Sequence, residues 1–268
     1  MAVGRRKRRK LGQHFLVDEG IADRIVEESG VKEGGRVLEV GPGRGVLTRR
    51  LIGKGAFVRA VELDRALHSE LKEKLDKPGV CEIEWGNALK FDFDSIEAPF
   101  DIVSNLPYSV CVALIKMFFD HMDKIKSMTL MVQSEVAARL TAKAGDSAYG
   151  SLSVYTSYHC KTERLFTAPP TAFSPRPKVE SAVISLKPLE KEPPVNISDK
   201  EAFFKFVMTC FAHRRKTIKN NLRDLWPDQG SFEQSLLSAG VEESERPQEI
   251  SLDRFSALFK EWEKSSSG

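Results

Sequence analysis

The chain has 268 residues, of which 41% are apolar and 29% charged, enough to bury the core of one α/β domain and a small second domain. Its formal net charge of +3 is uneven, because residues 1–10 carry six basic side chains and no acid, which leaves −3 for the rest. No apolar run reaches the roughly 18 residues of a membrane-spanning helix, and no apolar segment follows the basic start as in a secretory signal, so we expect neither a membrane protein nor a secreted one.

The basic start is a candidate nucleic-acid contact. A local cluster of positive charge on an otherwise acidic chain is typical of an arm that binds phosphates. A solvated tail and a nuclear-import signal are alternatives that the composition leaves open. The side chains expected to contact phosphates are Arg5, Arg6, Arg8 and Arg9.

Strand-like and helix-like stretches alternate over the first 140 residues. The hydrophobic patterns predict five strands and three intervening helices. This alternation is typical of a doubly wound, mostly parallel α/β sheet of the Rossmann type, in which ligands bind at the carboxyl ends of the strands. The predicted strands are 36–40, 57–63, 81–85, 100–104 and 128–133, and the helices are 46–52, 64–75 and 110–119.

The second half of the chain is predicted to change character twice. Residues 168–178 carry four prolines and predict a rigid, exposed loop before a last strand at 181–186. Residues 188–198 read as a linker, and apolar residues at helical spacing follow from residue 199. We therefore expect a basic arm at 1–10, an α/β domain at 11–187 and a small all-helical domain at 199–268.

The four cysteines are widely separated: Cys81, Cys111, Cys160 and Cys210. None forms a CxxC pair, so we expect no metal site and no disulfide framework. Free buried thiols fit a reducing compartment, and we expect a cytoplasmic protein.

The sequence VLEVGPGRGVLT, residues 37–48, predicts a strand, a glycine turn and a helix. Gly41 and Gly43 allow the backbone to approach a ligand closely. Glu39, just before the turn, would repel a pyrophosphate but suits a cationic ligand. The position of the last glycine of a dinucleotide-binding motif is occupied by Leu47. The pattern therefore favours S-adenosylmethionine, whose sulfonium and ammonium are positive, over a dinucleotide.

Two polar residues follow the next two predicted strands. Glu62 comes about 20 residues after the glycine turn, where a carboxylate can accept hydrogen bonds from ribose hydroxyls. Asn87 is placed to hydrogen-bond an adenine ring through its amide. A turn-forming role for Asn87 is as well supported by the sequence.

The segment Asn105-Leu106-Pro107-Tyr108 after the fourth strand is the most specific signal in the chain. Adenine N6 is a poor nucleophile because its lone pair is delocalised into the ring. The Asn105 side-chain oxygen and the Leu106 carbonyl can accept both N6 hydrogens, while Pro107 stiffens the turn. Tyr108 offers an aromatic face to a base taken out of its stack. We therefore expect direct methyl transfer to adenine N6, without a metal or a covalent intermediate.

Phe173 lies in the proline-rich segment. A hydrophobic ring on an exposed, stiff loop is unfavourable unless it covers something. We expect it to form a second aromatic wall for the base, with a loop anchor packed in the core as the alternative.

Taken together, these segments resemble the KsgA-type family of rRNA adenine N6-dimethyltransferases, which have the class I methyltransferase fold. The resemblance extends from Leu11 to about Leu225. Its anchors are GQHFL (12–16), EVGPGRG (39–45), VELD (61–64), NLPY (105–108), PPTAFSPRPKVESAVI (169–184) and HRRKTIKNNL (213–222).

The resemblance implies a donor site at His14, Leu16, Gly41, Glu62, Asn87 and Asn105. This chain has His14 where the family usually has Asn, and Asn87 where it usually has Asp. Both replacements can hydrogen-bond, so we expect donor binding to persist, with a pH dependence introduced by His14.

The resemblance also implies the substrate. This would be two adjacent adenosines near the 3′ end of small-subunit rRNA, each methylated twice by a monomeric enzyme within an assembling ribosomal subunit. RNA contacts are expected from basic residues of the helical domain, with a solvated helix face as the alternative: Arg214, Arg215, Lys216 and Lys219.

Three other functions remain possible at this point. A macrolide-resistance methyltransferase of large-subunit rRNA is disfavoured by the helical tail with its RRKT segment. A DNA adenine methyltransferase would need a target-recognition insert, which we do not see. A non-catalytic assembly factor on the same fold is disfavoured by the intact NLPY segment, glycine turn and Glu62.

Overall fold

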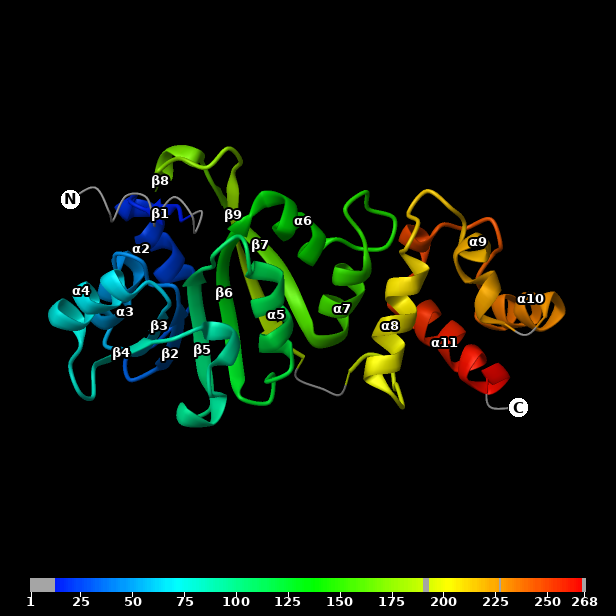
Figure 1. Ribbon diagram of the computed structural model, residues 1–268, viewed down its shortest axis with the longest axis horizontal. Helices are drawn as coiled ribbons and strands as arrows, with labels where there is room; N and C mark the ends of the chain where they lie inside the picture. Colours follow the sequence, from blue (N-terminus) through cyan, green and yellow to red (C-terminus); the bar gives the residue numbers. More distant parts are fainter. Residues whose placement is uncertain (1–12, 190–192, 227, 267–268) are drawn as a thin grey trace. The chain divides into compact units, whose positions relative to one another are not determined.

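The computed structural model describes residues 13–189, 193–226 and 228–266. The chain forms two compact units (Figure 1). The first comprises Met1–Ala137 with Thr162–Pro188, and the second comprises Ala138–Lys161 with Leu189–Gly268. In the described part of the chain, no helix is long and apolar enough to cross a membrane.

The first unit is built on a seven-stranded sheet of order β4-β3-β2-β5-β6-β9-β7. The five strands from β4 to β6 run parallel, and β9 pairs antiparallel with β6. The strands are β2 (Arg36–Val40), β3 (Phe57–Glu62), β4 (Cys81–Trp85), β5 (Phe100–Asn105), β6 (Ile125–Gln133), β7 (Cys160–Ala168) and β9 (Ser181–Pro188). The doubly wound, mostly parallel sheet predicted from the sequence is confirmed.

The helices of this unit are amphipathic and cover both faces of the sheet. Alternate residues of a strand point to opposite faces, and Val37 and Leu38 of β2 are both fully buried. Asp18 and Asp64 accept hydrogen bonds from the first turns of α2 and α4 through their side chains, which explains where those helices begin. The helices are α2 (Glu19–Glu28), α3 (Val46–Gly53), α4 (Arg65–Leu75) and α5 (Cys111–Phe119), with short 3-10 turns η1 (Ala88–Lys90) and η2 (Phe93–Ser95); α6 (Ser134–Thr141) extends into the second unit.

A second, two-stranded sheet joins the N-terminal segment to the proline-rich segment. Strand β1 (Phe15–Leu16) pairs antiparallel with β8 (Phe173–Ser174), and a 3-10 turn η3 (Pro170–Ala172) precedes β8. The proline-rich segment is therefore less exposed than predicted: Ala172 and Phe173 are buried in the core. Most of the segment is exposed, as predicted, but the pairing was not predicted because the partner strand lies about 160 residues away in the sequence.

The second unit is helical, with a core rich in aromatic side chains. Phe203 and Phe206 on α8 pack against Phe259 on α11, and Phe206 also packs against Trp226. Its elements are α7 (Ser151–His159), α8 (Lys200–Cys210), α9 (Ile218–Leu222), α10 (Gln229–Ser238) and α11 (Leu252–Ser266), with 3-10 turns η4 (Arg223–Leu225) and η5 (Pro247–Glu249).

The boundary of the helical unit differs from the one expected at residue 199. Residues 138–161 belong to it, because Val154 and Tyr158 of α7 pack in its core and the Tyr149 hydroxyl donates to the Ile250 carbonyl at 3.1 Å. No helix was predicted in this stretch, and local sequence patterns do not say which core such a helix joins.

Candidate active site

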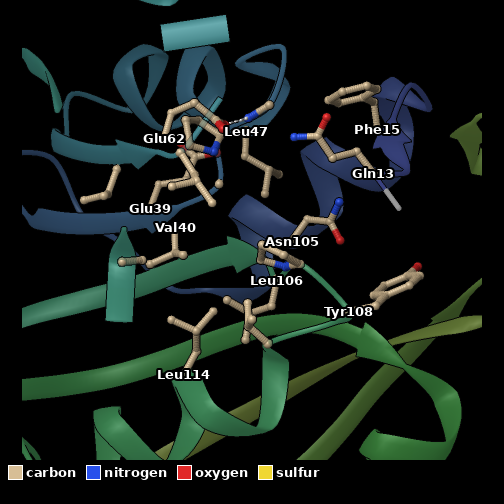
Figure 2. A pocket seen from close by; sticks show the side chains of 18 of the residues that line it. Gln13, Phe15, Glu39, Val40, Leu47, Glu62, Asn105, Leu106, Tyr108 and Leu114 are labelled. Atoms are coloured by element: carbon tan, nitrogen blue, oxygen red, sulfur yellow. Dashed lines mark hydrogen bonds between the residues drawn. The ribbon is translucent and has the colours of Figure 1, made fainter. Parts of the chain in front are cut away.

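A cavity of about 260 Å³ opens at the carboxyl ends of β2, β3 and β5 in the first unit (Figure 2). Binding at this edge is expected for a doubly wound sheet. All but one of the residues predicted for the donor and target sites line the cavity: His14, Leu16, Glu39, Gly41, Gly43, Glu62, Asn87, Asn105, Leu106, Pro107 and Tyr108.

The glycine turn after β2 forms one wall of the cavity. Gly41 and Gly43 have φ angles of +67° and +60°, in the left-handed region that other residues rarely adopt. A Cβ atom at Gly43 would lie 3.0 Å from the Phe15 ring, and one at Gly41 would lie 3.3 Å from the Pro107 ring. Any side chain at Gly41 or Gly43 would therefore occupy the space between the turn and the ring that faces it.

Glu39 places a buried carboxyl group at this wall. Its side chain is 2% exposed, and the Thr48 hydroxyl donates to its Oε2 at 2.7 Å. Burial raises the pKa of Glu39 to about 8, with a smaller contribution from the neighbouring charge of Glu62. A cationic ligand in the cavity would favour the ionised form, so the site suits the positively charged donor.

Glu62, at the end of β3, is tied to the glycine turn. Its Oε2 accepts from the Gly43 N–H at 3.2 Å, and its Oε1 accepts from the Asp64 N–H at 2.8 Å. Burial raises its pKa, against the opposing effect of these backbone donors. Each carboxylate oxygen keeps a further lone pair, so Glu62 can still accept hydrogen bonds from ribose hydroxyls.

The outer end of the cavity is apolar. Leu63 and Leu89 line it although they are 55% and 37% exposed, and the Trp85 indole N–H fixes the Leu63 carbonyl at 3.2 Å. The Asn87 oxygen accepts from the Leu89 N–H at 3.1 Å, so this side chain has the turn-forming role that the sequence left open. The combination of two exposed leucines and an asparagine amide fits a flat heteroaromatic ring such as adenine.

Asn105 and Leu106 form the opposite wall. Within residues 13–189, 193–226 and 228–266, the buried Asn105 Oδ1 has no hydrogen-bond partner. The turn itself is held rigidly, because the Leu106 N–H donates to the Met131 carbonyl at 3.0 Å and the Val110 N–H donates to the Pro107 carbonyl at 3.2 Å. Buried acceptors are rarely left unsatisfied, so this oxygen is positioned for a donor that a ligand brings.

Tyr108 stands beside this turn and is also held in place. Its hydroxyl hydrogen-bonds the Ser181 hydroxyl at 2.6 Å, and burial raises its pKa. The His14 ring lies 5.7 Å from the Tyr108 ring, and His14 Nδ1 donates to the Pro175 carbonyl at 2.7 Å. Two rings thus stand together on the target side of the cavity.

Phe173 is not one of these rings. Its side chain is 2% exposed and packs in the sheet core with Ala168 and Ala172, and its backbone pairs with Leu16. Phe173 therefore does not form the second aromatic wall that was expected. Its ring packs in the core, which was the alternative that the sequence left open. The pairing of β8 with β1 buries the ring.

Several other cavity residues were not predicted from the sequence, among them Gln13, Leu63 and Leu89. Gln13 belongs to the GQHFL segment and lines the cavity with a buried amide oxygen. Leu63 comes one position after Glu62, and Leu89 comes two positions after Asn87. An apolar residue directly after the end of β3 is the signal that would have found Leu63, whereas Leu89 lies in the turn η1 and no such signal marks it.

The basic residues expected to contact RNA divide into two groups. Arg214 donates to the carbonyls of Ser147 and Tyr149 at 2.8 and 2.9 Å, and Lys219 forms ion pairs with Glu233 and Glu243. In contrast, the side chains of two exposed neighbours make no hydrogen bond or ion pair with any residue that the structure describes: Arg215 and Lys216. Arg5, Arg6, Arg8 and Arg9 lie outside the described residues.

Comparisons with known proteins identify the family of the chain. The family model described as "Ribosomal RNA adenine dimethylase" matches residues 4–264. A ribosomal RNA small subunit methyltransferase A from Pseudomonas putida is 39% identical over 256 residues, which cover 94% of each chain.

Two solved structures are similar over nearly the whole chain. One is a dimethyladenosine transferase from Plasmodium falciparum, with a TM-score of 0.75 and 25% identity, covering 94% of this chain and 98% of that one. The other is the 23S rRNA methyltransferase ErmE, with a TM-score of 0.72 and 28% identity, covering 93% and 99%. The predicted class I methyltransferase fold, methyl donor and enzyme class are confirmed. The chain belongs to the ribosomal RNA adenine dimethylase family, whose members are S-adenosylmethionine-dependent methyltransferases.

Proposed function

We propose that this protein dimethylates N6 of two adjacent adenosines near the 3′ end of small-subunit rRNA, acting as a monomer on assembling subunits in the cytoplasm. The observation that carries the adenine chemistry is the buried, unpartnered Oδ1 of Asn105 on the cavity wall. The choice of small-subunit rRNA is supported by the 39% identity to the Pseudomonas putida small-subunit methyltransferase.

S-adenosylmethionine supplies an electrophilic methyl group carried on a positive sulfur. The glycine turn at Gly41 and Gly43 would let the donor lie close to the protein backbone. Glu62 would accept hydrogen bonds from the ribose hydroxyls of the donor. Glu39 provides a negative charge buried near the cationic end. Leu63 and Leu89 cover its adenine ring.

Asn105 and Leu106 act on the target base. The Asn105 Oδ1 and the Leu106 carbonyl would accept hydrogen bonds from the two N6 hydrogens, which draws the N6 lone pair out of conjugation with the ring. The donor, when bound, would supply the methyl group: its sulfur–methyl bond breaks as the N6–methyl bond forms, and N6 loses one hydrogen as a proton. Tyr108, fixed by Ser181, packs on the face of the extruded base and holds it against this turn. The catalytic gain comes from positioning and from acceptors arranged before the substrate binds.

RNA contacts outside the cavity are proposed for the exposed pair Arg215 and Lys216 of the helical unit and for the basic start of the chain. Arg214 and Lys219 already have partners within the protein and are not counted among these contacts. If phosphates are bound, RNA affinity should fall steeply with salt concentration. An affinity independent of salt would argue against these contacts.

Methylation of large-subunit rRNA is the second candidate, because the 23S rRNA methyltransferase structure aligns with 93% of this chain. The helical unit therefore does not exclude this activity, contrary to the expectation from the sequence. The difference in identity, 39% against 28%, favours the small subunit.

The test is methyl transfer from labelled S-adenosylmethionine to small and large ribosomal subunits that lack the modification, with Asn105→Ala as the control. Mass spectrometry of the digested rRNA identifies the product and its position. Dimethyladenosine near the 3′ end of small-subunit rRNA, absent with the variant, is the expected result. Product in large-subunit rRNA alone would favour the second candidate, and donor binding without transfer to either subunit would indicate a non-catalytic assembly factor.

A further inference from the structure

The connection between β8 and β9, residues 175–180, does not line the cavity. The burial of Phe173 leaves this exposed part of the proline-rich segment without a role. It carries two exposed basic side chains, Arg176 and Lys178. In the part of the chain that the structure describes, neither of them forms a hydrogen bond or an ion pair. Unlike Arg214, both therefore keep their full capacity to bind an anion.

Both ends of this connection are fixed to the target side of the cavity. At one end the Pro175 carbonyl accepts a hydrogen bond from His14 Nδ1 at 2.7 Å, and at the other end the Ser181 hydroxyl hydrogen-bonds the Tyr108 hydroxyl at 2.6 Å. The His14 and Tyr108 rings lie 5.7 Å apart, and both residues line the cavity. Figure 1 shows the connection running from β8, which pairs with β1, to β9. The connection therefore joins the two rings that stand on the target side.

The backbone presents the two basic side chains on one face. Pro177 between them is buried, whereas Arg176 and Lys178 are exposed, so burial alternates as it does in an extended segment. Pro175 and Pro177 fix their own φ angles, which lowers the conformational entropy that binding has to remove. Two cations and one acid, Glu180, leave the connection with a charge of +1. This face is a stiff, positively charged surface.

The position and the charge together identify the ligand. A base that enters the cavity has to leave its stack, and the RNA backbone next to it then lies at the cavity entrance. A guanidinium binds a phosphate through two parallel hydrogen bonds, and an ammonium binds it as a point charge. Such contacts fix the register of a nucleic acid without reading its sequence.

We propose that Arg176 and Lys178 bind the backbone phosphates next to the extruded adenosine and so position its base in the cavity. This role differs from the one proposed for Arg215 and Lys216, which lie in the helical unit. Contacts beside the reacting nucleotide affect the rate of methyl transfer as well as the affinity for RNA. The inference rests on the proposed function, because it takes rRNA as the substrate.

The location is tested by tethered cleavage of rRNA. Arg176→Cys is labelled with a thiol-reactive iron chelate, which generates hydroxyl radicals, and is bound at low salt to small ribosomal subunits that lack the modification. Cys81, Cys111, Cys160 and Cys210 are buried, so the label attaches at the introduced thiol. Lys32→Cys is the matched control: it is exposed and precedes β2, and so lies at the opposite edge of the sheet from the cavity. Co-sedimentation shows that each labelled protein is bound, and primer extension maps the cleaved nucleotides.

We expect radicals from position 176 to cleave rRNA within a few nucleotides of the methylated adenosines, and radicals from position 32 to leave this region intact. Cleavage from position 176 only in remote rRNA segments, or no cleavage in a bound complex, would overturn the proposal. A wild type that neither binds nor methylates small subunits would overturn the proposed function itself.

The charge requirement is tested with the double variant Arg176→Gln/Lys178→Gln. Its matched control is Lys32→Gln/Lys54→Gln, which removes two exposed charges that precede β2 and β3. We expect the first variant to lower kcat/KM for small subunits about ten-fold or more, and the slope of log affinity against log salt to become shallower by about one to two. The control should change neither quantity.

Two further measurements separate phosphate binding from a structural role. The unfolding temperature and the affinity for S-adenosylhomocysteine should be the same in the wild type and in both double variants, because the two side chains have no partners in the described chain. Arg176→Lys, which keeps the positive charge, should retain most of the wild-type affinity for small subunits. An unchanged salt slope in Arg176→Gln/Lys178→Gln would overturn the proposal, whether or not activity falls.

Discussion

The cavity of the first unit and the basic segment 213–219 of the helical unit both contain residues that the sequence marked as candidates for binding. In the cavity, the buried Asn105 Oδ1 has no hydrogen-bond partner in the described chain. Burial raises the pKa of Glu39 and of Glu62, although both carboxyl groups accept hydrogen bonds from the protein. In the basic segment, two of the four marked side chains already have partners. Arg214 and Lys219 have partners within their own unit.

This difference separates residues kept for a ligand from residues used by the fold. A buried polar group without a partner destabilises the empty protein, so its retention points to a bound state. A charged side chain with short internal contacts has already lost much of its capacity for a new partner. Residue type alone does not distinguish the two situations.

The Asn105→Ala variant tests this difference most strongly, because it removes the buried oxygen that has no partner in the described chain. We expect kcat for rRNA methylation to fall about 10²- to 10³-fold, because an acceptor of N6 hydrogens is lost. The free energy of unfolding should stay the same or rise, since the alanine leaves no buried oxygen unpaired. Steady-state kinetics and chemical denaturation measure the two quantities, with the exposed Asn196→Ala as control. Full activity in the variant would show that the oxygen is not reserved for substrate.

A smaller loss of function is expected for Gly43→Ala, which should weaken donor binding. The φ angle of +60° and the Phe15 ring, 3.0 Å from the new Cβ, both oppose the substitution. We expect a loss of about 1–2 kcal/mol in unfolding free energy and a loss of donor affinity of roughly ten-fold or more.

Gly30→Ala is the matched control for this variant. Gly30 has a φ angle of +66°, but no atom lies within 4 Å of a Cβ built there. It should show the backbone cost in unfolding free energy without any loss of donor affinity. Equal donor affinity for the two variants would mean that the turn at Gly43 is not part of the donor site.

Much of the α/β fold could be predicted because its signals are local. The bounds of β2 and β4 match the predicted strands at residues 36–40 and 81–85, each of which is followed directly by a glycine. The pairing of β1 with β8 and the packing of α7 into the helical unit could not be predicted, since each depends on contacts between residues far apart in the sequence.

The candidate site shows the same division. Glu39, Glu62 and Asn105 each follow or end a strand, and parallel strands bring their carboxyl ends together, so their common location could be predicted. The burial of Phe173 and the use of Arg214 by carbonyls 65 and 67 residues away could not. Those outcomes depend on tertiary neighbours that no local pattern contains.

The raised pKa of Glu39 predicts a pH dependence of donor binding. A cationic ligand favours the ionised carboxylate, so affinity should rise as the pH increases toward about 8, by at most about ten-fold per pH unit, and then level off. Glu39→Gln should flatten this dependence, and any remainder common to both proteins comes from Glu62 or from the ligand itself. Calorimetry from pH 6 to 9 measures it.

The same group affects stability with a defined sign. Because the pKa of Glu39 is about 8 in the folded protein and 4.5 ordinarily, the unfolded state releases the proton first. The unfolding free energy of the wild type should therefore fall as the pH rises from 4.5 to 8, and that of Glu39→Gln should fall less. Parallel pH profiles of the two proteins would show that Glu39 ionises normally.

In the helical unit, Arg214→Ala should reduce stability rather than catalysis. The variant loses the hydrogen bonds to the carbonyls of Ser147 and Tyr149, and we expect about 1 kcal/mol less unfolding free energy, discounted for partial exposure. Chemical denaturation measures this. RNA affinity, measured at one salt concentration where the variant is fully folded, should be unchanged; a drop of several-fold would mean that Arg214 contacts RNA as well.

The smallest effect is expected for Arg215→Ala, next in the chain. Its side chain is exposed and makes no hydrogen bond or ion pair with the described residues, so the unfolding free energy should change by less than about 0.5 kcal/mol. If Arg215 binds a phosphate, RNA affinity should fall a few-fold, and the slope of log affinity against log salt should become shallower by about one. Filter binding over a range of salt concentrations measures both. The assignment would be reversed if Arg215→Ala lowered the unfolding free energy and Arg214→Ala lowered RNA affinity. That result would mean that Arg214 exchanges its internal hydrogen bonds for contacts with RNA, and that Arg215 stabilises the fold.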